Sequence, residues 1–501
     1  MIMKNLVDMP ACLSACLSTS GLRRGCVLTM LLLAGCAVGP DYHKPSVAIP
    51  TTFKEGVDWQ RAATDPQAAL TGKWWLAYRD DELTGLVQHA LDANQSIAGA
   101  QAAYRLAEAT VAADRASLFP TITAGISGSR SRTGTNSTTL ESGGVNTVSN
   151  GTPDIRNFAS ATATADWEPD LWGQVRREIE SGKANAQAAD ATLAGERLSI
   201  VATVATDYFE VRQLDIDISL LKQQQAIDSR ILDITRDAYA QGTASSDNVL
   251  EAQDTLQLVV ADLQSSQTSR EQFEHAIAVL TGVPPASFSI KPRLDYVFST
   301  PAVPPTLPSE LLERRPDVVS AERMAEAANA RIGVAKAAFF PILDLSAEGG
   351  FQHNTLAHLF TLPSRVWTLG PDLAATLFDG GARTAAVHEA QATYDESVAA
   401  YREAVLTAFQ NVEDSLSSLN HLQQQEEAFA AVYARNQQLF VSERAQLSAG
   451  TASEENVLTQ QLTLLLAQQN LSDTQGALVQ SSVGLVKNLG GGWKWGKPTA
   501  K

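Results

Sequence analysis

The stretch Gly242-Thr243-Ala244-Ser245-Ser246-Asp247-Asn248-Val249-Leu250 decides the fold, because it returns 208 positions later as Gly450-Thr451-Ala452-Ser453-Glu454-Glu455-Asn456-Val457-Leu458. Two further landmarks recur in the same order. They are Ala116-Ser117-Leu118-Phe119-Pro120-Thr121-Ile122 with Ala337-Ala338-Phe339-Phe340-Pro341-Ile342-Leu343, and Leu171-Trp172-Gly173-Gln174-Val175-Arg176 with Leu377-Phe378-Asp379-Gly380-Gly381-Ala382-Arg383, the latter with a one-residue insertion. Three landmarks kept in order indicate that one unit of about two hundred residues was duplicated.

Long helices are predicted on both sides of the Gly-Thr-Ala-Ser signal. No proline occurs between Pro169 and Pro284, or between Pro371 and Pro498, and proline is the residue that helix interiors exclude. The glycine suits a left-handed C-terminal cap, and the serine suits the N-cap of the next helix. Apolar residues at steps of three and four are typical of coiled coils. We therefore expect helices at about 174–241, 246–281, 381–449 and 453–489, preceded by helices at about 81–118 and 309–340.

The segments that follow Pro120 and Pro341 change from a helical period to strict alternation. Strands are predicted at about 121–131, 157–167, 342–352 and 365–377. One face is small and apolar and the other is polar, as in the strands of outer-membrane barrels. A half-buried strand of a soluble sandwich would show the same pattern and is the alternative. Residues 132–156 and 353–363 join the strands and are predicted to be extracellular loops.

Four strands are too few to close a barrel in a membrane. The smallest such barrels have about eight strands, and an open edge in lipid leaves backbone groups without hydrogen bonds. The barrel interpretation therefore requires several copies of the chain. Between the two repeats, residues 284–308 hold seven prolines, which indicates a stiff connector.

The N-terminus predicts export and lipidation. Arg23-Arg24 precedes an apolar run from Cys26 to Leu33, which is far shorter than the ~20 residues of a spanning helix. The following Leu33-Ala34-Gly35-Cys36 resembles a bacterial lipobox, in which Cys36 would be acylated and become the first mature residue; an ordinary signal peptide is the alternative. All four cysteines lie at or before this position, so the mature chain has no disulfide.

Charge and motifs exclude several classes of function. The net charge is −17, and removal of a signal that carries +2 leaves −19, which argues against nucleic acid or anionic lipid surfaces as partners. Neither a zinc-binding His-Glu-x-x-His motif, a phosphate-binding glycine motif nor a nucleophile elbow is present. We expect no enzyme activity, cofactor or metal site. His353 and His358 are interpreted as residues of a solvated loop rather than as metal ligands.

Several motifs together resemble the TolC-like outer-membrane factors, in the lipoprotein branch (NodT/OprM-type) that serves resistance-nodulation-division efflux pumps. The motifs are Cys36-Ala37-Val38-Gly39-Pro40-Asp41-Tyr42, Trp74-Trp75 with Asp81 and Leu83, Leu312-Glu313-Arg314-Arg315-Pro316-Asp317-Val318, Gly333-Val334-Ala335-Lys336-Ala337-Ala338-Phe339-Phe340-Pro341, Leu377-Phe378-Asp379-Gly380-Gly381 and Leu489-Gly490-Gly491-Gly492-Trp493. The resemblance implies a mainly α protein that forms a homotrimer, with a trimeric α-barrel in the periplasm and a twelve-stranded β-barrel in outer-membrane lipid. It also implies two partners, a periplasmic adaptor and an inner-membrane pump of the resistance-nodulation-division type.

The resemblance gives the helix reversals a role. It implies that acids just past the turns line a periplasmic gate, and the candidates are Asp247, Glu251, Glu454 and Glu455. The acid of the second repeat often lies nine residues after the glycine; that position is Thr459 here, whereas Glu251 occupies it in the first repeat. The simpler alternative is that these acids stabilise helix starts through the helix dipole. The adaptor is expected to contact the tips, at Gly242, Thr243, Gly450 and Thr451.

These observations predict the following organisation: a signal peptide at 1–35, an N-terminal linker and equatorial segment at 36–80, a first repeat at 81–283, the connector at 284–308, a second repeat at 309–489 and a tail at 490–501. The expected function is the outer-membrane exit duct of a tripartite efflux pump. One alternative, the duct of a type I protein exporter, is disfavoured by the lipobox and by Arg314-Arg315-Pro316-Asp317. The other, a coiled-coil envelope scaffold without a pore, leaves the polar strand faces without a use.

Overall fold

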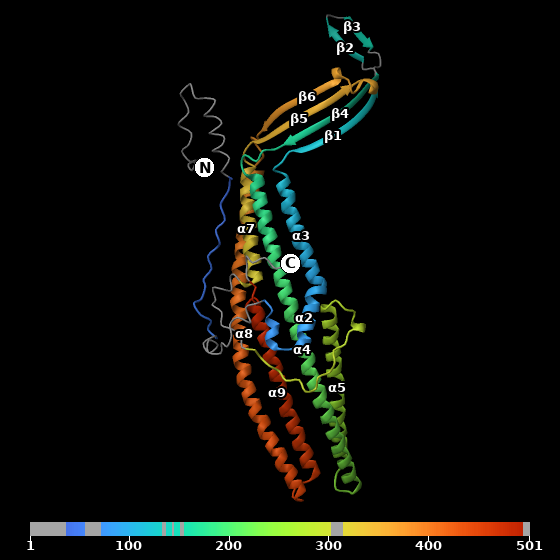
Figure 1. Cartoon of the computed structure of the whole chain (residues 1–501), viewed down its shortest axis with the longest axis vertical. Coiled ribbons are helices and arrows are strands. Elements are labelled where there is room, and N and C mark those ends of the chain that lie inside the picture. Colours follow the sequence, from blue (N-terminus) through green and yellow to red (C-terminus); the bar gives the residue numbers. More distant parts are fainter. Residues whose placement is uncertain are drawn as a thin grey trace. The chain divides into compact units, whose positions relative to one another are not determined.

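The computed structural model describes residues 37–55, 72–132, 137–142, 145–150, 155–301 and 314–493. These residues form two compact units. Unit 1 contains the described residues up to 42 together with 111–181 and 328–392; unit 2 contains 43–110, 182–327 and the described residues from 393 onward. Figure 1 labels the elements, and each unit is described in turn below.

The helices repeat in length as the sequence does. Two helices of 67 residues, α4 and α8, are each followed by a helix of 35 residues, α5 and α9. At 1.5 Å per residue the longer helices extend for ~100 Å. Among the described residues, no helix carries an apolar stretch of the length that crossing a membrane requires. The helix bounds are α2 Asp81–Ala93, α3 Gln95–Ala116, α4 Gln174–Ala240, α5 Ser246–Leu280, α7 Pro316–Ala337, α8 Ala382–Ser448 and α9 Glu454–Asn488, with short 3-10 turns η3 Trp74–Tyr78, η4 Pro285–Ser287, η5 Leu356–His358 and η6 Leu362–Ser364.

One expected helix, at 81–118, is two helices that meet at Asn94. The Asn94 side-chain oxygen accepts hydrogen bonds from the backbone N–H groups of Ser96 (2.9 Å) and Ile97 (3.1 Å), so it caps α3. Its amide nitrogen donates to the carbonyl of Leu280 at the end of α5 (2.9 Å). Asn94 itself has an extended backbone. A short polar side chain that bonds nearby backbone groups competes with helix continuation, which explains the break.

Unit 1 contains an antiparallel sheet of four strands in the order β1-β4-β5-β6. The bounds are β1 Thr121–Arg132, β4 Ile155–Trp167, β5 Ile342–His353 and β6 Arg365–Ala374. Directly paired residues in such a sheet share a face. The register aligns Ile122, Ala165, Ala347 and Leu369 in one row and Thr123, Thr164, Glu348 and Thr368 in the next. The alternation predicted strand by strand is therefore a property of the whole sheet, with one apolar and one polar face.

Two connections differ from the expectation. Residues 132–156, expected to be a loop, include a hairpin of β2 Ser137–Ser142 and β3 Val145–Asn150, whose threonines and valines favour strands. Strand β6 ends at Ala374 rather than at 377. Beyond it, Arg383 donates to the carbonyl of Thr376 (2.7 Å) and pairs with Asp379 (2.6 Å), which holds the chain in a turn before α8.

Unit 2 is built around an apolar core at the level of α2. Fully buried side chains project from four helices at helical spacing. The core members include Leu83 and Val87 of α2, Val204, Tyr208 and Val211 of α4, Val412 and Leu416 of α8, and Val479 and Leu485 of α9. Trp74 and Tyr78 of η3 are buried in the same core. The Tyr78 hydroxyl lies 2.7 Å from that of Ser482 on α9.

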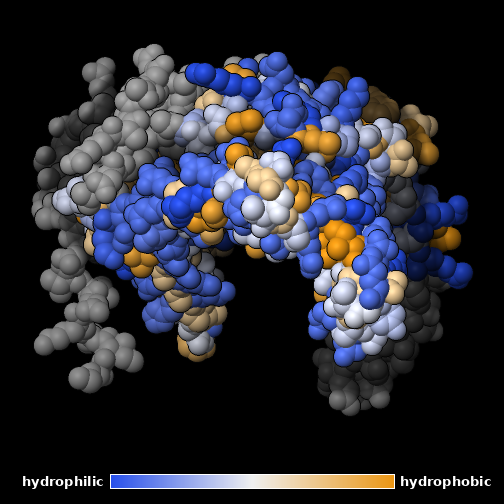
Figure 2. Space-filling model, turned by 90° about the horizontal axis from the view of Figure 1, so that it is seen from below, coloured by the Kyte–Doolittle hydropathy of each residue, from blue (hydrophilic) through white to orange (hydrophobic). Residues whose placement is uncertain are grey.

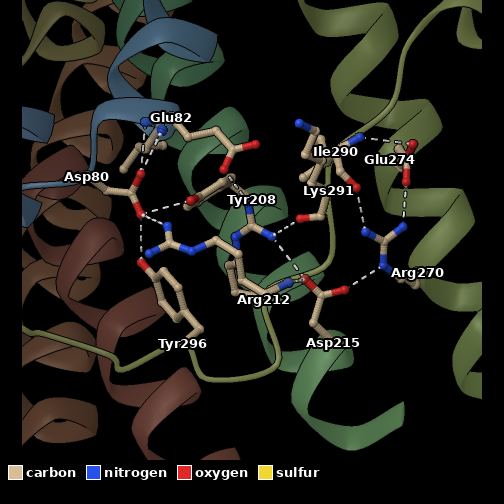
Figure 3. Close-up of polar contacts among 12 residues, drawn as sticks. Asp80, Glu82, Tyr208, Arg212, Asp215, Arg270, Glu274, Ile290, Lys291 and Tyr296 are labelled. Carbon is tan, nitrogen blue, oxygen red and sulfur yellow. Dashed lines mark hydrogen bonds and ion pairs between the residues drawn. The ribbon is translucent and has the colours of Figure 1, made fainter. Parts of the chain in front are cut away.

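A polar network lies next to this core and fastens the residues before α2 and after η4 to the helices (Figure 3). Asp80 caps α2 with one carboxylate oxygen, which accepts from the N–H groups of Glu82 and Leu83. Its other oxygen accepts from the hydroxyls of Tyr208 on α4 (2.8 Å) and Tyr296 (3.1 Å). One carboxylate thus ties three segments together.

Arg212 of α4 is the centre of the same network and is fully buried. Its guanidinium pairs with Asp215 (2.9 Å) and Glu82 (2.5 Å) and donates to the carbonyl of Lys291 (2.8 Å). Arg270 of α5 pairs with the other oxygen of Asp215 (2.6 Å). The network therefore joins α4, α5, the start of α2 and the connector. Its arginine side chains pair with carboxylates of the same network.

Removal of Arg212 tests how much this network stabilises the fold. Arg212→Met leaves a buried carboxylate with one of its two cations missing, so we expect a loss of roughly 3 kcal/mol or more. Arg293→Met is the control, because Arg293 is half-exposed and its contact with Asp80 is long (3.4 Å); it should cost at most ~1 kcal/mol. Denaturation of the detergent-solubilised chain, followed by far-ultraviolet circular dichroism, measures both. Equal losses would contradict the prediction.

Candidate functional site

The two helix reversals in unit 2 have the same backbone geometry. Gly242 (φ +77°) and Gly450 (φ +74°) are in the left-handed region that favours glycine. After each glycine, the threonine N–H bonds back to the carbonyl five residues earlier: Thr243 to Ala238 and Thr451 to Gln446, each at 2.9 Å. This is the Schellman arrangement that ends a helix. The conserved Gly-Thr pair of the repeat is thus explained by helix termination.

The next helix begins within three residues of each turn. Ser245 accepts a hydrogen bond from the N–H of Asn248 (3.2 Å), and the Asn248 side chain bonds back to Ser245, which completes a capping box. In the second repeat, Ser453 accepts from the N–H of Asn456 (3.1 Å). N-terminal caps of this kind contribute ~1 kcal/mol each. One turn and one cap define each reversal, so both tips are encoded in the sequence.

The predicted adaptor contacts are exposed at these tips. Gly242, Thr243, Gly450 and Thr451 are all exposed, and a Cβ added at either glycine would meet no other atom within 4 Å. Seen from the end that carries the reversals, the surface is mainly hydrophilic, with small scattered apolar patches (Figure 2). The glycines are therefore required by their backbone angles and not by packing inside the chain. Their contact with a partner remains a prediction.

The four candidate gate acids are exposed; Asp247, Glu454 and Glu455 lie in the first turns of their helices, and Glu251 lies one turn further along α5. The structure places Asp247 and Glu251 on α5, and Glu454 and Glu455 on α9. In the described part of the chain, only Glu454 of the four forms an ion pair. No basic side chain in that part is shared between the acids of the two reversals. The structure of one chain therefore shows two separate acidic tips, and their joint role as a gate stays a prediction.

The partner of Glu454 is Arg230 of α4, a residue that the sequence reasoning missed. The guanidinium donates to both carboxylate oxygens, at 2.8 and 3.0 Å, so α4 and α9 are joined by a two-pronged contact. The hydrogen bond from Arg230 lowers the pKa of Glu454. The position of this partner depends on how the two repeats pack side by side. No pattern within either repeat could have indicated it.

The lipidation candidate, Cys36, lies outside the described residues, but the segment that follows it is firmly held in unit 1. The N–H of Val38 donates to the carbonyl of Trp172 (3.0 Å), and Arg177 of α4 pairs with Asp41 (2.8 Å). Gly39 (φ +113°) passes so close to Gly333 of α7 that a Cβ would lie 2.5 Å from its Cα. This tight groove fixes residues 37–41 beside the strand-to-helix junction that leads into α4.

The two loop histidines lie near each other without forming a metal centre. The His353 and His358 rings are 5.6 Å apart, and His353 Nδ1 accepts from the N–H of Thr355 (3.0 Å). Within the described residues, no group of three or more His, Cys, Asp or Glu side chains is placed to hold a metal ion.

Duplicated long helices with capped reversals, together with a four-stranded sheet that has one apolar face, define a class of envelope proteins. The outer membrane efflux protein family model matches residues 86–283 and 307–491, which is most of the chain. The chain therefore belongs to the outer membrane efflux protein family.

Individual relatives agree with this assignment. The probable efflux pump outer membrane protein TtgC of Pseudomonas putida is 28% identical over 466 residues, which cover 93% of this chain and 94% of the relative. The pyoverdine export outer membrane protein OpmQ of Pseudomonas aeruginosa is 30% identical over 467 residues, covering 93% and 95%. Among solved structures, the outer-membrane channel OprN aligns with a TM-score of 0.78 at 26% identity, over 91% of this chain and 99% of that one. The Campylobacter jejuni CmeC channel, at 22% identity, a TM-score of 0.80 and 92% and 96% coverage, shares the fold.

The Arg230–Glu454 contact predicts a change in the spacing of the two tips. We expect Arg230→Gln to shift the α4 tip away from the α9 tip, because the contact that joins these helices is lost. Spin labels at the exposed positions Gln241 and Ala449, with labelled chain diluted in unlabelled chain, report this separation by pulsed electron resonance.

Arg236→Gln is a matched control for this measurement. Arg236 lies on the same helix with the same side-chain exposure of 51%, but it pairs with Asp233 within α4. Its replacement should leave the distance distribution unchanged. If Arg230→Gln also leaves the distribution unchanged, the contact does not hold the tips together.

Proposed function

We propose that this chain is the outer-membrane exit duct of a tripartite efflux pump, which passes small molecules from the periplasm to the exterior. The observation that carries the proposal is the sheet of unit 1. Its apolar side chains are uncovered in one chain, with Ile122, Trp367 and Leu369 exposed to 73%, 75% and 70%. Lipid is the environment that such a face requires, and the opposite polar face suits a water-filled lumen.

The edges of the sheet support a homotrimer. β1 and β6 each have one paired neighbour in the sheet, so each presents an unpaired edge. Unpaired backbone groups in hydrocarbon cost several kcal/mol each, so copies of the chain must complete the barrel. Three copies with four strands each would close it with twelve strands, as the family resemblance implies. The proposed partners beyond the trimer are a periplasmic adaptor, which contacts the helix tips, and an inner-membrane pump of the resistance-nodulation-division type.

The class of cargo follows from the relatives. They include proteins named for the efflux of toluene and of antibiotics and for the export of pyoverdine. All of these are small molecules, so small molecules rather than polypeptides are the proposed cargo. In the trimer, the gate acids would bring twelve carboxylates near one axis. Positive charges are needed to offset the repulsion between these carboxylates, and Arg230 supplies one such charge within each chain.

The duct proposal predicts a conducting trimer. Light scattering of the detergent-solubilised protein should give three copies per particle, and planar-bilayer recordings should show a conductance that prefers cations, since rings of acids select them. Replacing Asp247, Glu251, Glu454 and Glu455 with their amides should reduce that preference. A folded monomer that is stable in detergent would contradict both the barrel and the duct.

We further propose that Cys36 is the lipidated first residue of the mature chain. The lipobox-like sequence motivates this, and the held segment at 37–41 would keep the acyl chains beside the strand-to-helix junction. Intact-mass analysis should give a triacylated species that begins at Cys36. The acyl chains would anchor the chain, since each buried methylene adds ~0.8 kcal/mol of membrane affinity. Cys36→Ala should lose that mass. A mature N-terminus elsewhere, without lipid, would contradict the proposal.

A further inference from the structure

Helix α4 makes two different kinds of polar contact with its neighbours in unit 2. Toward α5, the carboxylate of Asp215 lies between two guanidinium groups, those of Arg212 (2.9 Å) and Arg270 (2.6 Å). Opposite charges meet there. Two residues further along α4, Asp217 faces α9. The charged groups near it, Asp473 and Glu210, are acidic like Asp217 itself.

A glutamine side chain joins α4 to α9 at this second contact. The amide nitrogen of Gln213 donates to Asp217 of its own helix (3.1 Å) and to Asp473 of α9 (2.7 Å). Its oxygen lies 3.4 Å from the hydroxyl of Ser472, which donates to it. Gln213 and Ser472 are both buried. One amide therefore gathers two carboxyl groups from different helices.

The backbone of α9 is shaped to receive that amide. Gly476 lies one turn after Ser472, and a Cβ at this position would be 2.7 Å from the Gln213 oxygen. Any side chain larger than hydrogen would displace the amide. The groove formed by Ser472, Asp473 and Gly476 thus fits Gln213, which makes this a built contact rather than a chance meeting of surface acids.

The charges around the pair are acidic. Burial, followed by the charge of Asp473, raises the pKa of Asp217 to about 7. Burial of the carboxyl group and, less strongly, the charge of Glu210 raise the pKa of Asp473 as well, although the residue as a whole is exposed to solvent. From α8, Glu426 reaches α9 two residues further on, where it accepts from Gln475 (2.9 Å). Lys222, five residues beyond Asp217 on α4, is exposed to solvent.

We propose that Asp217, Gln213 and Asp473 form a proton-responsive seam between α4 and α9, which is closed while the two carboxyl groups share a proton and loosened when both are ionised. With one proton present, Asp217 donates a hydrogen bond to Asp473, and the Gln213 amide bonds both. Without it, two like charges converge on one neutral amide and repel each other.

The sign of the pH effect follows from the direction of the shift. A carboxyl group whose pKa is raised by folding binds its proton more tightly in the folded contact. Its stabilising contribution is therefore present in acid and is lost as the pH rises through about 7. The seam should be closed at pH 6 and loosened at pH 8.

The consequence for the duct rests on the proposed function. The hairpin of α4 and α5 and the hairpin of α8 and α9 each end in one of the capped reversals, and both reversals lie at the same end of unit 2 (Figure 1). The seam joins one helix of each hairpin. Acidification would therefore hold the two tips together, and a rise in pH would favour their separation.

Hydrogen exchange of the full-length protein tests the seam without reference to transport. The measured quantity is the opening constant of backbone amides around Asp473 on α9, corrected for the intrinsic pH dependence of exchange. In the unmodified chain it should rise about tenfold between pH 6 and pH 8. Asp217→Asn keeps a neutral donor toward Asp473, so its opening constant should stay at the low-pH level throughout.

Two further variants complete the test. Asp262→Asn, an exposed aspartate on α5, should keep the full pH response. Gly476→Ala should loosen the contact at both pH values, because it displaces the Gln213 amide. A pH-independent opening constant in the unmodified chain, or a full response in Asp217→Asn, would overturn the proposal. Planar-bilayer conductance, measured in parallel, separates this result from the duct: a seam that responds in a protein that does not conduct would contradict only the proposed function.

Discussion

Backbone hydrogen bonding in lipid is the constraint on which the proposed architecture depends. Among the described residues, the four-stranded sheet leaves one row of N–H and C=O groups without a strand partner on β1 and another on β6. Water satisfies such groups at the surface of a soluble protein, but hydrocarbon cannot. A chain with this sheet and this apolar face can enter a membrane if β1 of one copy pairs with β6 of the next around a symmetry axis. Oligomerisation would then follow from the strand count.

The predictable part of this fold is local in sequence. The turn at Gly242 was predicted because a left-handed glycine followed by an N-capping serine has one common structural meaning, and φ of +77° with the cap at Ser245 confirms it. The strand faces were predictable for a similar reason, since alternation has a period of two residues. The break at Asn94 was missed because the apolar period continues across it. Its local cause is the cap that the Asn94 side chain gives α3, and a hydrogen bond to the carbonyl of Leu280, 186 residues away, adds a contact that no local pattern indicates.

What the sequence could not predict is the pairing between distant helices. Arg212 occurs in an ordinary helical pattern, and nothing in that pattern indicates that Glu82 and Lys291 will meet it. Arg230 and Glu454 are 224 positions apart, and their contact depends on the relative rotation of α4 and α9. The role of Gly476 could not be predicted from the sequence either, because glycine within a helix is usually read only as a weak helix former. Its meaning appears once the Gln213 amide occupies the space that a Cβ would fill.

The two polar contacts of α4 show how one helix can be fixed on one side and adjustable on the other. Matched charges at Asp215 hold α4 to α5 and to the connector, so these elements should move as one body. Toward α9, the same helix adds to its apolar packing a neutral amide, two acids and, nearer the tip, the exposed Arg230–Glu454 pair. Contacts of exposed charges are weak and screened by salt. Changes in salt concentration would therefore weaken the polar contacts of α4 with α9 before those with α5, while apolar side chains pack α4 against both neighbours.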